Sequence, residues 1–144
     1  MKLFLLLLFF SVCFTFLFSS EIKAQNRKSV GGAEVTGTFR SRNGNEFSIL
    51  ALGKGKLRIG FSGIYEYDSA YGKMANTGEA EGIAEIEGDT AVFTPEDFDE
   101  CTITIKFLVG GKLEVTQDGT DADCGFGANV FADGIYKKIS NKKP

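Results

Sequence analysis

Apolar and polar residues alternate along most of the chain between residues 31 and 139. A period of two places successive side chains on opposite faces of a β-strand, so one set is buried and the other stays in water. No stretch shows a competing helical period. The alternation predicts strands over residues 33–40, 46–52, 56–67, 78–87, 90–94, 101–109, 112–117 and 129–139.

Short turn sequences separate most of these strands. They are rich in glycine and asparagine, which tolerate positive φ, and lie at residues 43–45, 53–55, 88–89 and 110–111. Residues 68–77 form a longer predicted connection with room for one helical turn, and residues 118–127 form an irregular loop. Short strands with regularly spaced turns are typical of barrels and sandwiches. We expect an all-β fold, a small antiparallel meander β-barrel of about eight strands, with a two-sheet β-sandwich as the alternative.

Closure into a barrel pairs the first strand with the last and removes exposed sheet edges. Side chains can fill the interior of so small a barrel completely. The inward positions carry large aromatic residues, namely Phe39, Phe47, Phe61, Phe93, Phe107 and Tyr136. The inward face of the fourth predicted strand carries only small residues, namely Gly78, Ala80, Gly82 and Ala84. This face either leaves room for a ligand or accommodates the aromatic rings.

The first 24 residues have a different character from the rest. Lys2 precedes a mostly apolar run over residues 3–18, and a short polar region ends at Ala24. This order is typical of an export signal, and an uncleaved anchor is the alternative, although the run is shorter than the ~20 residues that a bilayer span needs. We expect residues 1–24 to be a signal peptide and residues 25–144 to be a single domain without a membrane span, periplasmic or secreted.

The part that follows the predicted signal contains two cysteines, Cys101 and Cys124. An even pair in an exported chain predicts a disulfide. Closing a loop of about 24 residues is expected to stabilise the fold by about 3 kcal/mol. The alternative, a nucleophilic cysteine, lacks a histidine to act as its base.

The chain contains no histidine, which excludes the usual acyl-transfer triads, histidine zinc sites and HExxH hydrolases. Its glycine pairs lie between strands instead of opening a helix, so no phosphate-binding loop is predicted. A formal net charge of −3 argues against a nucleic-acid partner. We expect neither an enzyme nor a cofactor, and a hydrolase that uses two carboxylates is kept as a third hypothesis.

The loop from Asp118 to Asp123 has a composition that resembles calcium-binding loops. Its spacing differs from that of an EF-hand, and no glutamate occupies the twelfth position from Asp118 or Asp121. No metal site is therefore predicted.

Two groups of residues are candidates for binding a partner. Acidic residues precede both cysteines, namely Glu96, Asp97, Asp99 and Glu100 before Cys101, and Asp118, Asp121 and Asp123 before Cys124. The predicted disulfide would gather them into a patch that favours a cationic partner. The segment with Tyr65, Tyr67, Tyr71, Met74 and Asn76 adds residues of the kind found at interfaces. The alternative is that the tyrosines pack the barrel mouth and the acidic residues confer solubility.

The second half of the sequence carries a recognisable series of motifs. Residues 75–82 are followed by Cys101, by Cys-Gly-Phe-Gly at 124–127 with Asn129-Val130, and by a terminal Gly134-Ile135-Tyr136. Over residues 75–138 this series resembles small exported bacterial β-barrel proteins, mostly uncharacterised, some of which are grouped with lysozyme inhibitors. The glycine-serine-rich inhibitory loop of c-type lysozyme inhibitor barrels has no recognisable counterpart.

The resemblance implies a non-enzymatic binding protein that acts through surface loops, with a cationic protein such as a lysozyme as partner. The alternative function is a lipocalin-like carrier of a small apolar ligand. A carrier needs interior space beside residues 78–84.

Overall fold

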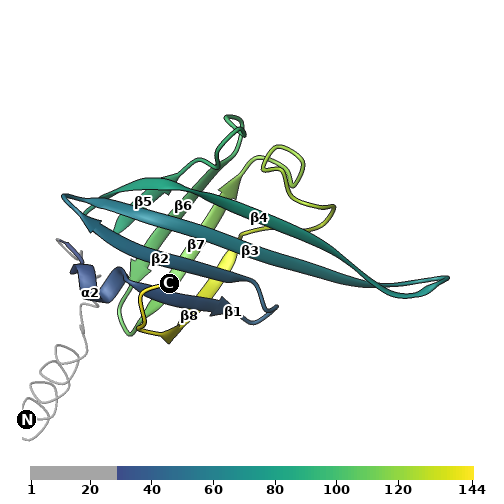
Figure 1. The fold of residues 1–144 in the computed structure, drawn as a ribbon, viewed down its shortest axis with the longest axis horizontal. Coiled ribbons are helices and arrows are strands. Elements are labelled where there is room, and N and C mark those ends of the chain that lie inside the picture. The colour runs from purple at the N-terminus through teal and green to yellow at the C-terminus, as the bar shows by residue number, and fades with distance from the viewer. Residues whose placement is uncertain (1–28) are drawn as a thin grey trace, which may run out of the picture.

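Eight antiparallel strands close into a barrel in the order β1-β2-β3-β4-β5-β6-β7-β8, with β8 paired to β1 (Figure 1). The computed structural model describes residues 29–144, so the predicted signal peptide lies outside the described residues. The predicted meander barrel is confirmed, and the sandwich alternative is wrong. The strands are β1 Gly37–Ser41, β2 Glu46–Gly53, β3 Lys56–Ser69, β4 Gly72–Glu87, β5 Thr90–Phe93, β6 Thr102–Leu108, β7 Lys112–Asp118 and β8 Gly134–Ser140.

The start of the first predicted strand is wrong, because one turn of helix, α2, occupies Gly32–Val35. The ammonium of Lys138 donates to the carbonyls of Glu34 and Thr36 at the end of this turn. Val35 is buried against the core, as is Phe39 on β1. Burial of these two residues makes the segment look like one continuous alternating strand, although its first half is helical.

The predicted long connection over residues 68–77 is also wrong. β3 and β4 stay paired as far as Ser69 and Gly72, so Ala70 and Tyr71 alone form a tight turn. The Ser69 hydroxyl accepts from the Tyr71 N–H at 3.1 Å and donates to the Gly72 carbonyl at 2.8 Å. Gly72 has a φ of 108°, which favours glycine. The segment is therefore the outer part of a long hairpin.

The last strand is shorter than predicted, because β8 begins at Gly134 and not at residue 129. Residues 119–133 form a loop across one end of the barrel, and Phe126, Val130 and Ala132 in it are buried. These three side chains close the end of the barrel. In the sequence, their spacing looks like one buried face of a strand.

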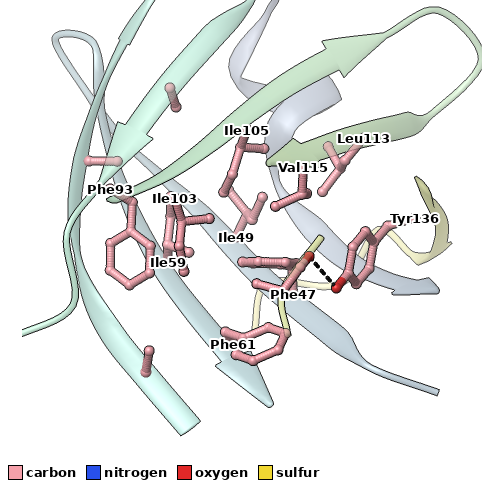
Figure 2. Packing of buried hydrophobic residues seen from close by; sticks show 14 of the residues in the cluster. Phe47, Ile49, Ile59, Phe61, Phe93, Ile103, Ile105, Leu113, Val115 and Tyr136 are labelled. Carbon is pink, nitrogen blue, oxygen red and sulfur yellow. Dashed lines mark hydrogen bonds between the residues drawn. The ribbon is translucent and has the colours of Figure 1, made fainter. Parts of the chain in front are cut away.

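Aromatic side chains fill the barrel interior (Figure 2). The ring of Phe47 lies 5.0 Å from that of Phe61 and 4.9 Å from that of Tyr136, measured between centroids. The buried hydroxyl of Tyr136 donates to the Ala132 carbonyl at 2.8 Å. Burial raises the pKa of Tyr136, so the phenol stays protonated and keeps this hydrogen bond.

The small residues of β4 accommodate aromatic rings. A Cβ added to Gly82 would lie 2.7 Å from Cε2 of Phe93, and one added to Gly78 would lie 2.8 Å from Cγ of Phe126. The missing side chains thus leave their space to two neighbouring rings. The inward face of β4 therefore makes room for aromatic rings and not for a ligand.

Different elements cover the two ends of the barrel. At one end, α2 is held by the bond from the Ala51 N–H to the Thr36 hydroxyl, 3.0 Å long. At the other end, the loop 119–133 inserts Phe126, whose ring centroid lies 5.0 Å from that of Phe61. Within residues 29–144, no helix has the length and apolar character to cross a membrane.

Candidate interaction surface

A disulfide joins Cys101, at the start of β6, to Cys124 in the loop 119–133. The two Cα atoms are 4.9 Å apart, and both residues are fully buried. The predicted pairing is confirmed. It fixes the loop 119–133 against the barrel.

The disulfide also places the two acidic loops beside each other. A Cβ added to Gly119 would lie 3.0 Å from the Glu100 carbonyl oxygen and 3.4 Å from the Cα of Cys101. The side chains of Glu96, Asp97, Asp99, Glu100 and Asp118 are exposed. These five residues lie at the same end of the barrel, and we call them the acidic rim.

Two of the predicted partner-binding carboxylates instead hold the loop 119–133 together. Asp123 accepts from the N–H and the hydroxyl of Thr120, each at 2.7 Å. Asp121 accepts from the Ala122 N–H at 2.8 Å and the Asn129 N–H at 2.6 Å. Within residues 29–144, no group of three or more cysteine, aspartate or glutamate side chains is placed to hold a metal ion. The geometry gives Asp121 and Asp123 a structural role in the loop.

We expect acid to loosen this loop. The bonds from the Thr120 N–H and hydroxyl lower the pKa of the Asp123 carboxyl. A carboxyl whose pKa is lowered on folding stabilises the folded state at pH values above its ordinary pKa of 3.8. This stabilisation is lost as the pH falls through the lower pKa of the folded state. Hydrogen exchange of the Thr120 amide, corrected for its intrinsic pH dependence, should therefore show less protection in acid. Asp123→Asn should show reduced protection already at neutral pH, and equal protection in both proteins at both pH values would contradict the assignment.

The hairpin of β3 and β4 continues well past the barrel and forms the long projection in Figure 1. Tyr65 pairs with Asn76 and Tyr67 pairs with Met74, so these four side chains lie on one face of the projection. The two tyrosine rings stack with centroids 6.2 Å apart. Tyr71 at the tip is 97% exposed. The tyrosines therefore do not pack the barrel mouth, which Phe126 and Val130 fill.

Asn76 has a structural role at the base of this projection. Its amide Nδ2 donates to the Ala128 carbonyl at 2.8 Å, and the Gly127 N–H donates to the Thr77 carbonyl at 2.9 Å. Both bonds tie the hairpin to the loop 119–133. Asn76 is thus engaged, while Tyr65, Tyr67 and Tyr71 are available to a partner.

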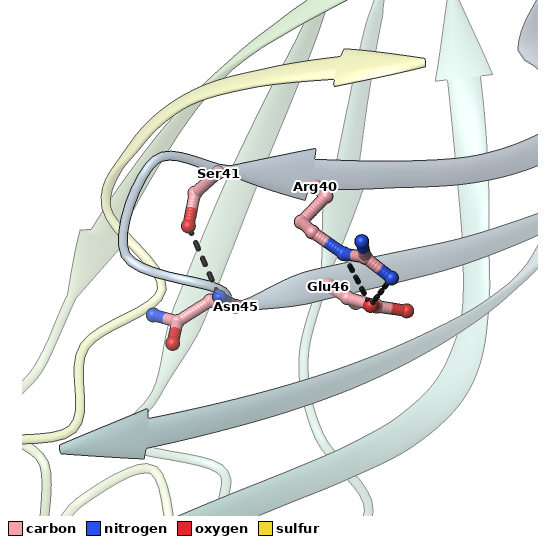
Figure 3. A network of polar contacts seen from close by, with 4 residues as sticks. All are labelled: Arg40, Ser41, Asn45 and Glu46. Atoms are coloured by element: carbon pink, nitrogen blue, oxygen red, sulfur yellow. Dashed lines mark hydrogen bonds and ion pairs between the residues drawn. The ribbon is translucent and has the colours of Figure 1, made fainter. Parts of the chain in front are cut away.

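Sequence reasoning assigned Asn45 only to a turn, yet it is the one buried polar residue among residues 29–144. Its Oδ1 accepts from the Ile64 N–H and its Nδ2 donates to the Phe131 carbonyl, both at 3.0 Å. Figure 3 shows it at the β1–β2 turn, where its own N–H donates to the Ser41 hydroxyl and the Arg40–Glu46 ion pair lies nearby. The hydrophilic composition of the turn gave no signal for these contacts.

A surface groove of about 610 Å³ lies beside Asn45. It runs between β3 and the loop 119–133, and Ile64 and Phe131 expose about two fifths of their side chains there. The lining residues are Asn43, Asn45, Ile64, Tyr65, Glu66, Asn129, Phe131 and Asp133. The hairpin, the acidic rim and this groove all adjoin the loop 119–133.

No protein-family model, curated protein or solved structure matches this chain. The resemblance to exported bacterial barrels therefore stays a prediction.

Proposed function

We propose that the protein is an exported, non-enzymatic binding protein that takes a cationic protein, such as a lysozyme, on the hairpin and the acidic rim. The observation that carries the proposal is the projection of β3 and β4 beyond the barrel, with Tyr65 and Tyr71 exposed and Tyr67 half-buried beside Tyr65. Tyrosine is enriched among the residues that dominate binding energy, because it buries a large area at a low entropic cost. A rigid scaffold that presents such residues is typical of a recognition protein.

The acidic rim supplies the complementary charge. The loop 119–133 connects it to the hairpin, through Cys124 on one side and through the bond between Asn76 and Ala128 on the other. One partner can therefore contact both surfaces. Complementary charge accelerates encounter and selects the partner, while the tyrosines, once covered by the partner, supply most of the affinity.

The other candidate functions lack supporting geometry. A lipocalin-like carrier needs interior space beside β4, where the rings of Phe93 and Phe126 lie instead. A carboxylate hydrolase needs an inward pair of acids, and Asn45 is the sole buried polar residue in the part of the chain that the structure describes.

We expect titration calorimetry with a c-type lysozyme at low ionic strength to show binding that weakens as salt is added. Replacing Tyr67 and Tyr71 by alanine should weaken it by roughly tenfold or more. Replacing Glu96, Asp97, Asp99 and Glu100 by their amides should mainly slow association and flatten the salt dependence.

Val109→Ala is the matched control, since Val109 is 62% exposed but lies in the β6–β7 turn. The Gly111 carbonyl of this turn accepts from the N–H of Lys138, whose ammonium binds the end of α2, so the turn belongs to the other end of the barrel. The control variant should bind as the unaltered protein does. Absence of binding at low ionic strength would rule out a lysozyme as partner, and equal loss in the control would rule out the surface.

A further inference from the structure

The outer part of β3 has an edge without a partner strand. β2 pairs with β3 only as far as Glu46 and Ser62, whereas β3 continues to Ser69. The Ile64 N–H points to this edge, where the Asn45 side chain takes the place of a strand and accepts its hydrogen bond. Backbone groups alternate in direction along a strand, so those of Glu66 and Asp68 point to the same edge.

The opposite edge of the hairpin, on β4, is occupied at its base. The Thr77 carbonyl, opposite Ile64, accepts from the Gly127 N–H at 2.9 Å. The Asn76 side chain adds its bond to Ala128. Beyond these base positions neither edge has a partner strand in the described part of the chain, but their charges differ: the β4 edge carries Lys73 and Ala75, whereas the β3 edge carries Asp68 and Glu66 opposite them. The β3 edge is therefore the one suited to a basic strand.

The open edge adjoins the groove beside Asn45. Ile64, Tyr65 and Glu66 form its β3 side, and Phe131 in the loop 119–133 contributes an apolar side chain across from them. A strand added to β3 would continue the line of β2 past Asn45 and lay alternate side chains against Ile64 and Phe131. A sheet edge gives affinity through main-chain bonds, and adjacent pockets give specificity.

The charges at this edge favour a basic occupant. Glu66 and Asp133 line the groove, and no lysine or arginine does. Asp68 lies opposite Lys73 across the hairpin, whereas Glu66 lies opposite Ala75 and has no basic residue facing it in the register. A lysine or arginine in the added strand would face Glu66 directly.

A second copy of the chain fits this edge poorly. Pairing of two β3 edges would bring Glu66 and Asp68 of one copy against the same residues of the other. Like charges directly opposite in a sheet are destabilising, and charged edges are a usual protection against self-association. The edge therefore discriminates between a basic strand and a copy of itself.

We propose that the β3 edge from Tyr65 to Ser69 binds an extended basic segment of a partner protein by β-strand addition. The inference rests on the proposed function and specifies how the hairpin holds its partner. A two-stranded ribbon in water is only marginally stable, and a third strand makes it a stable sheet. Binding and ordering of the hairpin are thus coupled.

The test is an NMR titration of the protein with an end-capped octapeptide of alternating lysine and valine. The expected result is a shift of the Glu66 and Asp68 amides, together with intermolecular contacts between strand protons. The same peptide N-methylated at alternate residues should bind at least about tenfold more weakly, because it loses its edge-facing donors. A peptide of alternating glutamate and valine should not bind.

The matched variants are Glu66→Ala and Glu66→Pro. The alanine variant keeps the edge N–H and should lose only the electrostatic part of the affinity, whereas the proline variant should lose the peptide altogether. Because residue 66 points its N–H away from β4, the hairpin amides of Tyr65 and Tyr67 should keep their positions in both variants.

Three outcomes would overturn the inference: shifts confined to the β4 edge, equal binding of the N-methylated peptide, or self-association through Glu66. Its failure is distinguishable from that of the proposed function. If Glu66→Pro still binds lysozyme like the unaltered protein, strand addition is wrong while the binding function stands. If the octapeptide binds the edge and no cationic protein binds, the edge accepts a strand but the proposed partner is wrong.

Discussion

Replacing Phe93 by alanine is expected to lower the free energy of unfolding by about 3–5 kcal/mol. The Phe93 side chain on β5 is fully buried, and its ring occupies the space beside Gly82 on β4. Gly82 has no side chain with which to fill the resulting cavity. Small domains have a total stability of only about 5–15 kcal/mol, so the loss is a large fraction of it. Urea denaturation followed by circular dichroism measures the change.

Val92→Ala is the control, because Val92 is the preceding residue of the same strand but is 51% exposed. It should change the stability by about 0.5 kcal/mol or less. A loss below about 1 kcal/mol for Phe93→Ala would show that the ring does not fill the interior.

Gly82→Ala provides a second check of the same contact. In the unaltered protein its Cβ would meet the Phe93 ring, and in the Phe93→Ala background the ring is gone. The substitution should therefore destabilise the first protein more than the second. A double-mutant cycle with additive effects would contradict direct packing between the two residues.

The barrel strands could be predicted because the interior selects apolar side chains at every second position. Phe47 and Ile49 on β2 and Ile59 and Phe61 on β3 are buried, and their neighbours in sequence are not fully buried. Because only every second residue of such a strand is buried, the sequence alternates between apolar and polar residues. The strand number and the meander order follow from it together with the short turns.

The outer hairpin could not be predicted by the same rule. Beyond Gly63 there is no barrel interior, so Tyr65, Asp68 and Met74 are exposed regardless of the face on which they lie. Pairing continues there because the backbone ladder and the tight turn at Ser69 suffice. The predicted strand therefore stops at Tyr67, whereas β3 and β4 stay paired as far as Ser69 and Gly72.

The candidate site was predictable only in part, for a similar reason. An even pair of cysteines in a chain predicted to be exported indicates a disulfide, so the pair of Cys101 and Cys124 could be named in advance. The role of an aspartate cannot be read from the sequence in the same way. Asp99 is exposed to water, whereas Asp123 accepts a hydrogen bond from the Thr120 N–H. Asn45 was missed because its partners, Ile64 and Phe131, are far from it in sequence.

Removing the disulfide is the other large effect that we expect. Reduction, or the double substitution of Cys101 and Cys124 by alanine, should lower the free energy of unfolding by about 3 kcal/mol. The two residues are separated by 23 positions, so the bond closes a loop that contains all of β6 and β7. Most of the stabilisation comes from the restriction of the unfolded chain, because the folded ladder between these strands does not require the bond.

The location of the cross-link makes its functional consequence specific. Without it, residues 96–100 of the acidic rim lose their covalent link to the loop 119–133, while the Asn76–Ala128 bond still holds that loop to the hairpin. We therefore expect weaker salt dependence of lysozyme binding and retained contact at Tyr67 and Tyr71. Urea denaturation of the oxidised protein, the reduced protein and the double alanine variant measures the stability. The last two should coincide, and equal midpoints for all three, or thiol labelling of Cys101 and Cys124 in the native protein, would refute the cross-link.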